Sequence, residues 1–296
     1  MIERISPAQG LHGVVHVPGD KSISHRYAML TSIAEGDSHI YNYSTGGDCQ
    51  STLACMKRLG IAHEFAEEDG RRILTVHGKG LNGLEAPAGE MDAGNSGSTI
   101  RMLAGILAAQ PFTSRIGGDD SLSKRPMGRI MTPLAAMGAR IEAAGGQFPP
   151  LTIHGSGLRG IAYEPPVASA QVKSCVLLAG LYAEGETEVR EPVRTRDHTE
   201  IALSELGAEI AMEPCLVRVR GGAVLAAKDL VVPGDLSAAA FFIVAALMIR
   251  DADLTIANVG LNPTRTALLD VLRGMGARIK PVHIEQVNGE LIGTLE

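Results

Sequence analysis

A short phrase built on Leu-Gly or Met-Gly and followed by Ile recurs four times along the 296-residue chain. No other feature of the sequence constrains the fold so strongly. The glycines of the phrase are Gly60, Gly138, Gly207 and Gly276, which lie 78, 69 and 69 residues apart. A unit of about seventy residues is therefore used repeatedly, and this period is longer than that of the common solenoid repeats.

Each repeat has the same internal order. A small polar segment opens an apolar stretch of helical period, a strand follows, and a polar loop leads to a second helix that ends at the recurrent glycine, a natural left-handed cap. The first helices are predicted at residues 24–35, 98–110, 169–184 and 237–250, and the strands after them at 38–43, 112–117, 186–190 and 253–258. Another strand is expected to open with the Ile. The pattern predicts an α/β fold of repeated β-α-β-α-β-β units.

Two apolar stretches, 175–181 and 238–249, are predicted to form helices that are covered on most sides. A repeated junction suggests where the chain passes between domains: Val17 to Asp20 and Val232 to Asp235 both read Val-Pro-Gly-Asp. We expect residues 20–233 to form a complete three-repeat domain, and 1–19 with 234–296 to form part of a second domain with one repeat. A single repeat cannot bury both faces of its helices, so this second part is expected to be marginally stable.

Charge and composition exclude several classes of protein. The net charge is -6 and no run of Lys or Arg exceeds two residues, which argues against a nucleic-acid-binding surface. Any anion must therefore bind in a local pocket. The longest apolar run, 238–249, is too short to cross a bilayer, and residues 1–10 lack the apolar core of a signal peptide.

The four cysteines are spaced unlike any zinc or redox motif, and no H-E-x-x-H sequence is present, so no metal is expected. We interpret these cysteines as buried thiols in a reducing compartment, and the protein as cytoplasmic. They are Cys49, Cys55, Cys175 and Cys215.

Three predicted helix starts carry groups that suit an anion. A helix N-terminus leaves backbone N–H groups unpaired and concentrates partial positive charge, which favours phosphate or carboxylate. The loop Lys124-Arg125-Pro126 adds a guanidinium that could grip an oxyanion through two hydrogen bonds. The three starts are Gly19 to Arg26, with Lys21, Ser22 and Arg26; Gly94 to Arg101, whose glycines admit a ligand close to the backbone; and Ser169 to Lys173.

Any one of these segments alone would be read as an ordinary helix cap, because Ser, Asp and Asn are the usual capping residues. Three helix starts that carry polar or cationic side chains, in consecutive repeats, together with an arginine loop, favour an anion-binding site. His25 and His198 lie near these segments, but neither has a partner pattern that marks a catalytic base. We interpret both as hydrogen-bonding or surface residues.

The segments Gly19–Arg26, Gly94–Arg101, Lys124–Met127 and Ser169–Gln171 occur in an order and spacing that resembles the 5-enolpyruvylshikimate-3-phosphate synthases. The resemblance covers the whole chain. It implies an enzyme of the shikimate pathway of aromatic amino-acid biosynthesis. In that reaction the 5-hydroxyl of shikimate 3-phosphate adds to the enol carbon of phosphoenolpyruvate, and phosphate is eliminated from a tetrahedral intermediate.

The resemblance also implies roles for individual residues. Lys21 would contact both substrates and is the catalytic residue that it places in this chain. Shikimate 3-phosphate would be held by Lys21, Ser22, Arg26, Ser169, Ala170, Gln171 and Arg196. Phosphoenolpyruvate would be held by Lys21, Asn95, Gly97, Arg125 and Gln171. The resemblance calls for no metal and no organic cofactor, and it implies a monomer once the enzyme is complete.

The sequence departs from the family in small ways. Ser98 stands where threonine is commoner, and Ala170 where some members have a second serine. Gly97, rather than alanine, suggests that the herbicide glyphosate could enter the phosphoenolpyruvate pocket.

A larger departure is length, because the family has six repeats and this sequence contains four. The D-E-x-P and R-x-K-E-x-x-R segments, which supply the proton-transferring carboxylates and further cations in the family, would fall beyond Glu296. Since general acid–base catalysis needs those carboxylates at the reacting atoms, the 296-residue chain by itself is expected to show no turnover.

Two other functions remain open at this point. The related UDP-N-acetylglucosamine enolpyruvyl transferases share the repeat fold. They typically carry Lys-Asn where this chain has Lys21-Ser22, and they use a loop cysteine, whereas this chain has no cysteine between Gly117 and Met127. The second alternative is a non-catalytic anion-binding or assembly fragment.

Overall fold

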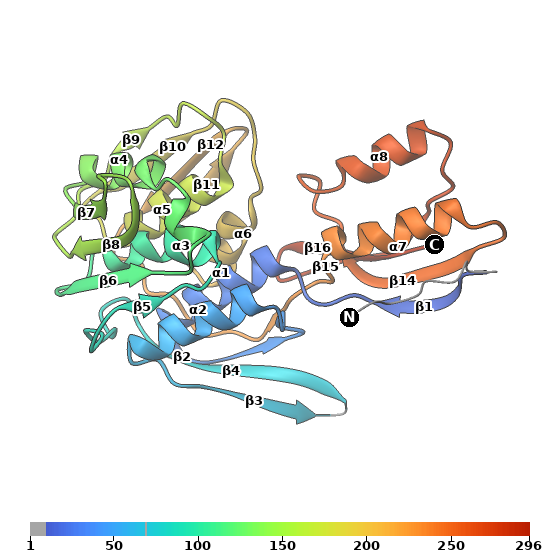
Figure 1. Ribbon diagram of the computed structural model, residues 1–296, viewed down its shortest axis with the longest axis horizontal. Coiled ribbons are helices and arrows are strands. Elements are labelled where there is room, and N and C mark those ends of the chain that lie inside the picture. The colour runs from blue at the N-terminus through green and yellow to red at the C-terminus, as the bar shows by residue number, and fades with distance from the viewer. Residues whose placement is uncertain (1–9, 69) are drawn as a thin grey trace.

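A computed structural model describes residues 10–68 and 70–296 of the chain. The predicted absence of a signal peptide concerns residues that lie almost wholly outside this range. Within these residues, four four-stranded sheets and eight α-helices form two lobes joined by a narrow crossing (Figure 1). We call residues 20–233 the first lobe, and residues 10–19 with 234–296 the second lobe.

The predicted β-α-β-α-β-β order is confirmed throughout. The first stretch of chain contains β1 (His12–His16), α1 (Lys21–Ser32), β2 (Glu35–Tyr41), α2 (Gly47–Arg58), β3 (His63–Glu68) and β4 (Arg71–Lys79). The second contains β5 (Met91–Asp92), α3 (Gly97–Leu107), β6 (Thr113–Gly117), α4 (Gly128–Ala136), β7 (Arg140–Ala144) and β8 (Phe148–His154).

The third and fourth stretches repeat this order. The third contains β9 (Ala162–Tyr163), α5 (Ala170–Gly180), β10 (Glu186–Arg190), α6 (His198–Glu205), β11 (Ile210–Glu213) and β12 (Leu216–Arg220). The fourth contains β13 (Leu230–Val231), α7 (Leu236–Met248), β14 (Asp253–Gly260), α8 (Ala267–Gly274), β15 (Pro281–Val287) and β16 (Glu290–Leu295).

The recurrent glycines end the second helix of every repeat, as predicted. Gly60, Gly138, Gly207 and Gly276 have φ values of 85°, 107°, 90° and 96°. This is the left-handed region, which glycine enters without a steric penalty. The strand that follows begins within two residues of the Ile in each repeat.

The predicted ends of the first helices need small corrections. α1 begins at Lys21 rather than at residue 24, because the Asp20 carboxylate accepts a hydrogen bond from the Ile23 amide and caps the helix there. α5 begins after Ser169 and ends at Gly180, four residues before the predicted end. In both cases the cap, rather than the apolar pattern, determines where the helix begins.

The first strand of the first repeat pairs in the sheet of the fourth repeat, and the first strand of the fourth repeat pairs in the sheet of the first. β1 pairs in parallel with β14, so the N-terminal strand completes the sheet of the second lobe, in the order β1-β14-β16-β15. In return β13 pairs in parallel with β2 and completes the first sheet of the first lobe. This exchange supports the proposed division of the chain at 19/20 and 233/234.

The buried helices of the first lobe form its core. Nearly every residue of α1, α3 and α5 is buried, and these helices belong to one continuous apolar cluster, while a much smaller cluster fills the second lobe. α3 and α5 approach closely at Gly105, where a Cβ atom would lie 2.2 Å from the Cys175 carbonyl oxygen. The glycine therefore sets the distance between the two helices.

The prediction that the helix over 238–249 is covered on most sides is wrong. α7 packs one face against the sheet of the second lobe, but Phe241 and Met248 are each 80% exposed and Val244 and Leu247 are also exposed. The apolar pattern reports what the helix could bury, whereas burial needs a packing partner. In the described chain the sheet of the second lobe covers one side of α7 (Figure 1).

The close approach at Gly105 gives the first prediction. Gly105→Ala is expected to lower the free energy of unfolding by about 2 kcal/mol, because its methyl group would force α3 away from the α5 backbone. Urea denaturation measures the effect. Gly128→Ala in α4 is the matched control, since a Cβ there meets nothing within 4 Å, and it should lose no stability. Equal stability of the two variants would contradict the close packing.

Candidate functional site

The first anion-binding segment lies at the start of α1. With Asp20 as the cap, Lys21 and Ser22 occupy the first turn of the helix, where the unpaired backbone N–H groups lie. The Lys21 ammonium is half exposed and lies 3.1 Å from a carboxylate oxygen of Asp48, a residue that sequence reasoning did not single out. Lys21 is thus charged, accessible and held at the helix end.

The second segment lies at the start of α3. Ser96 caps this helix by accepting a hydrogen bond from the Thr99 amide, so Gly97 is the first helical residue. The Arg125 guanidinium reaches this helix start from the loop after the short 3-10 turn Leu122–Lys124, and it donates to the Asn95 side-chain oxygen at 2.7 Å. The Asn95 amide in turn donates to Asp119 at 2.8 Å. The structure therefore brings Asn95, Gly97 and Arg125 together.

The third segment, at the start of α5, is joined to the second by Gln171. The Gln171 side-chain oxygen accepts a hydrogen bond from Arg101 at 2.9 Å, and its amide donates to the Ser98 hydroxyl at 2.9 Å. Ser169 caps α5 through the Val172 amide. Because Arg101 and Ser98 belong to α3, the two helix starts form one continuous polar surface.

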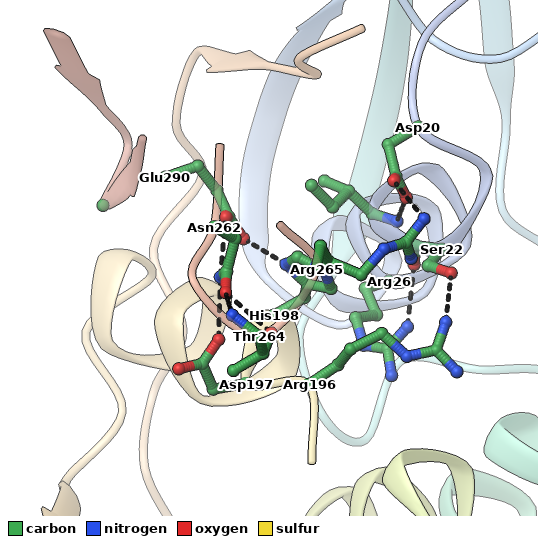
Figure 2. A network of polar contacts seen from close by, with 12 residues as sticks. Asp20, Ser22, Arg26, Arg196, Asp197, His198, Asn262, Thr264, Arg265 and Glu290 are labelled. Carbon is green, nitrogen blue, oxygen red and sulfur yellow. Dashed lines mark hydrogen bonds and ion pairs between the residues drawn. The ribbon is translucent and has the colours of Figure 1, made fainter. Parts of the chain in front are cut away.

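A pocket of about 450 Å³ opens at the start of α5. Arg196 lines it from the loop before α6 and donates to the Ser22 hydroxyl at 3.1 Å, which ties this loop to α1 (Figure 2). Thr264, from the second lobe, also lines the pocket. Its lining residues are Ala168, Ser169, Ala170, Gln171, Thr195, Arg196 and Thr264.

Arg26 lies beneath this surface rather than on it. Its guanidinium is almost fully buried and donates to Thr199 at 2.6 Å, to Ser174 at 2.8 Å and to the Ser22 carbonyl oxygen at 2.8 Å. Burial lowers its pKa to about 10, so it stays charged at neutral pH. These contacts hold α1 against α5 and α6, and they leave Arg26 fewer free donors than Arg196.

Two groups of cations lie close together in this region. Burial lowers the pKa of Arg101, and the nearby charges of Arg125 and Arg129 lower it further. Burial likewise lowers the pKa of Arg196, with Arg265 as the next cause. Like charges held together in a partly buried site repel one another, and a bound anion relieves that repulsion. The two groups of cations mark two candidate anion subsites, although Arg265 is already paired with Asp20 at 3.5 Å and with Asp235 at 3.3 Å.

A chain of buried hydroxyl groups supports the first two helix starts from below. The His25 ring nitrogen Nδ1 lies 2.6 Å from the Thr52 hydroxyl, which contacts the Thr99 hydroxyl at 2.7 Å, and Thr99 donates to Ser96 at 2.7 Å. Burial lowers the His25 pKa to about 3, so the imidazole is neutral. The prediction that His25 is a hydrogen-bonding residue is confirmed.

A buried ionic cluster supports α5. The Lys173 ammonium is 1% exposed and lies 2.7 Å from Glu191 and 2.6 Å from Glu200. Burial raises the pKa of Glu200, although the Lys173 charge opposes this. Glu191 also accepts from the Thr195 hydroxyl, one residue before Arg196. The cluster joins α5, the end of β10 and α6.

Sequence reasoning missed several of these residues. Arg101 ends a segment that was singled out, and its position one turn after Gly97 was a usable signal that it could reach the helix start. Lys173 also ends a segment that was singled out, and its place in an otherwise apolar helix indicated that it needs a partner, whereas Asp48 gave only a weak signal. Thr264 gave none, because it comes from the other lobe.

One of the cysteine predictions needs a correction. Cys49, Cys55 and Cys175 are buried as predicted, and burial raises the thiol pKa of both Cys49 and Cys55 to about 12. Cys215 is only partly buried, because it occupies the tight turn between β11 and β12 at a φ of 59°. His198 is hydrogen-bonded and buried, which confirms its interpretation as a hydrogen-bonding residue.

Within residues 10–68 and 70–296, no three His, Cys, Asp or Glu side chains gather as a metal site. None of the helices described there has both the length and the apolar character needed to span a bilayer.

Repeated α/β units with polar helix starts gathered at one face define a protein that binds small anions. A family model described as EPSP synthase (3-phosphoshikimate 1-carboxyvinyltransferase) matches residues 5–292. The chain belongs to the EPSP synthase family. This bears out the resemblance that the sequence motifs indicated.

Individual relatives agree with the family match. The chain is 63% identical to the 3-phosphoshikimate 1-carboxyvinyltransferase of Solibacter usitatus (strain Ellin6076) over 296 residues, covering all of this chain and 68% of that protein. It is 49% identical to the same enzyme of Bacillus subtilis (strain 168), covering 92% and 63% of the two chains.

A solved structure of EPSP synthase from Acinetobacter baumannii superimposes with a TM-score of 0.90 at 45% identity, over 97% of this chain and 64% of that one. The chain thus spans about two thirds of the length of the relatives that it matches.

The buried cluster around Lys173 gives the second prediction. Lys173→Met should lower the free energy of unfolding by about 3 kcal/mol at about pH 8, because it leaves two buried carboxylates without a counter-charge. Lys228→Met is the control. Lys228 pairs with Glu205 near the surface, and its loss should cost less than about 1 kcal/mol.

The pH dependence has a definite sign. Removing the ammonium raises the folded-state pKa of the buried carboxyls above the unfolded value, so the penalty is present above that raised pKa and shrinks as they take up protons. The loss for Lys173→Met should therefore be smaller at about pH 5 than at about pH 8. A loss independent of pH would contradict a charged cluster.

Proposed function

We propose that this chain provides the substrate-binding face of an enolpyruvyl transferase acting on shikimate 3-phosphate and phosphoenolpyruvate. One observation carries the proposal. Gln171 lies in the Arg196 pocket and also contacts Arg101 of the neighbouring cation group, so the two anion subsites share a wall. Two anionic substrates bound in these subsites would lie side by side, as group transfer between them requires.

The two subsites suit different substrates. Ser22, Ser169, Ala170, Gln171 and Arg196 surround or adjoin the pocket at the start of α5, and we assign shikimate 3-phosphate to it. Arg26 would contribute mainly by holding Ser22 and α1 in place.

Asn95, Gly97 and Arg125 form the other subsite, which we assign to phosphoenolpyruvate. Lys21 stands at the α1 start and is assigned to both substrates.

These residues would act by electrostatic stabilisation. Addition of the 5-hydroxyl to the enol carbon moves charge among carboxylate, phosphate and a developing cationic carbon, and cations fixed before the reaction lower the cost of that redistribution. Lys21, at the start of α1, supplies one of these cations in this proposal. The family resemblance assigns proton transfer to carboxylates outside residues 1–296.

The alternative functions are less well supported. The relatives named above are all 3-phosphoshikimate 1-carboxyvinyltransferases, which favours this reaction over transfer to a UDP-sugar. A non-catalytic anion-binding fragment would use the same surface, so only measurements on the chain separate it from an enzyme. The cytoplasmic location and the monomeric state stay predictions.

Calorimetry with shikimate 3-phosphate on the 296-residue chain tests the assignment. The chain should bind this ligand, and Lys21→Met should weaken binding about tenfold, the usual effect of losing a charge-assisted hydrogen bond. Lys79→Met is the matched control. Lys79, the last residue of β4, pairs with Glu85, and the affinity of this variant for shikimate 3-phosphate should not change. Absence of binding to the unmodified chain, or equal binding by both variants, would contradict the proposal.

Gly97 gives a separate prediction about inhibition. A Cβ at this position would lie 2.8 Å from the Arg101 guanidinium and 3.5 Å from that of Arg125, so it would narrow the phosphoenolpyruvate subsite. In the active enzyme that carries this chain, Gly97→Ala should raise the half-inhibitory concentration of glyphosate more than about tenfold. The KM for phosphoenolpyruvate should rise less. Unchanged inhibition would rule out entry of glyphosate beside Gly97.

A further inference from the structure

The second lobe contacts the Arg196 loop through a buried polar network that the proposed catalytic roles do not use. Figure 2 shows Asn262 and Glu290, from the second lobe, beside Asp197 and His198, which directly follow Arg196 in the chain. Asn262, Glu290 and His198 are all buried, and Asp197 is largely so. Polar groups buried at a junction must find partners there.

Asn262 is the centre of this network. Its amide nitrogen donates to the Asp197 carboxylate at 2.8 Å and to the Glu290 carboxylate at 3.2 Å. Its carbonyl oxygen accepts from the Thr264 amide at 2.9 Å and from the Thr264 hydroxyl at 2.7 Å. The partners determine how the side-chain amide is oriented, because two carboxylates need a donor and Thr264 supplies donors.

The partners of Asn262 are themselves anchored. Glu290, at the start of β16, lies 2.6 Å from His198, the first residue of α6. Asp197 also accepts from Arg194 at 2.7 Å. Burial by itself would raise the pKa of Asp197, but the hydrogen bonds from Asn262 and Arg194 outweigh it and lower the pKa. Asp197 is therefore a carboxylate that depends on these donors.

The network can affect ligand binding through two neighbours. Arg196 immediately precedes Asp197, so the position of its backbone depends on where Asp197 is held. Thr264 lines the same pocket as Arg196, and both its amide and its hydroxyl are held by Asn262. One buried asparagine thus contacts both Thr264 and the neighbour of Arg196, and Thr264 and Arg196 line the pocket, one from each lobe.

We propose that Asn262 is a positioning residue that fixes the Arg196 loop and Thr264 relative to each other where the two lobes meet. The proposal rests on the assignment of this pocket to shikimate 3-phosphate. Asn262 does not touch the ligand. It acts through Asp197 on the cation that binds the phosphate and through Thr264 on another part of the pocket lining.

Binding measurements on the 296-residue chain test this with a matched control. Asn262→Ala should weaken binding of shikimate 3-phosphate about tenfold and leave that of shikimate unchanged, because the displaced guanidinium serves the phosphate. Asn262→Asp should do the same, since it sets a third carboxylate against Asp197 and Glu290. Asn288→Gly is the control. It removes another asparagine that crosses the junction, bonded to Val231 and Asp229, at a φ of 48° that glycine tolerates, and its affinities should not change.

A double-mutant comparison separates positioning from general loss of structure. If Asn262 acts through Arg196, Asn262→Ala should cause little further loss in an Arg196→Met background. A full tenfold loss in that background, or an equal loss for Asn288→Gly, would overturn the proposal.

Hydrogen exchange of the ligand-free chain provides a second readout. The amides of residues 194–198 should exchange faster in Asn262→Ala than in the unmodified chain or in Asn288→Gly. If the unmodified chain binds no shikimate 3-phosphate, the proposed function fails, and the exchange rates alone decide whether Asn262 holds the loop. Unchanged exchange in Asn262→Ala overturns the positioning role in either case.

Discussion

The geometry of this protein depends on the packing of α3 against α5 at Gly105. The two helices approach so closely that a single methyl group would meet the Cys175 carbonyl oxygen, and this distance brings their N-termini together. Only then can Gln171 of α5 contact both Arg101 and Ser98 of α3. The anion-binding face is thus a consequence of core packing, because buried helices that begin at one edge present their unpaired N–H groups there.

Holding several arginines together costs free energy. Two buried layers of polar contacts under the helix starts offset that cost. A neutral chain from His25 through Thr52 to Thr99 stabilises the starts of α1 and α3 without adding charge. Under α5, Lys173 is matched by two carboxylates, so the charge that fixes the helix is compensated locally. Both layers are buried and held by hydrogen bonds or ion pairs in this structure, the kind of preorganisation on which electrostatic stabilisation depends.

The sequence could predict features that are local or periodic. The cap glycines, such as Gly138, follow from backbone conformation, and the three helix starts follow from capping chemistry. The exposure of Phe241 could not be predicted, because an apolar pattern does not report which neighbours are present. The contacts of Asn262 with Asp197 and of Glu290 with His198 join residues 65 and 92 positions apart, and no spacing rule encodes them. Lys21, Asn95 and Gln171 could be placed at helix starts from the sequence because helix starts are local features.

The exchange of β1 and β13 determines the order in which the chain can fold. Once residue 231 has been synthesised, all the strands of the first lobe are present, because β13 pairs with β2 and completes its first sheet. β1 has no such early partner, because His12 pairs with Asp253 on β14. During synthesis from the N-terminus, the first strand therefore waits for a partner that emerges after the whole first lobe. Until then β1 is an unpaired strand edge, the kind of element on which chaperones and misfolding both act.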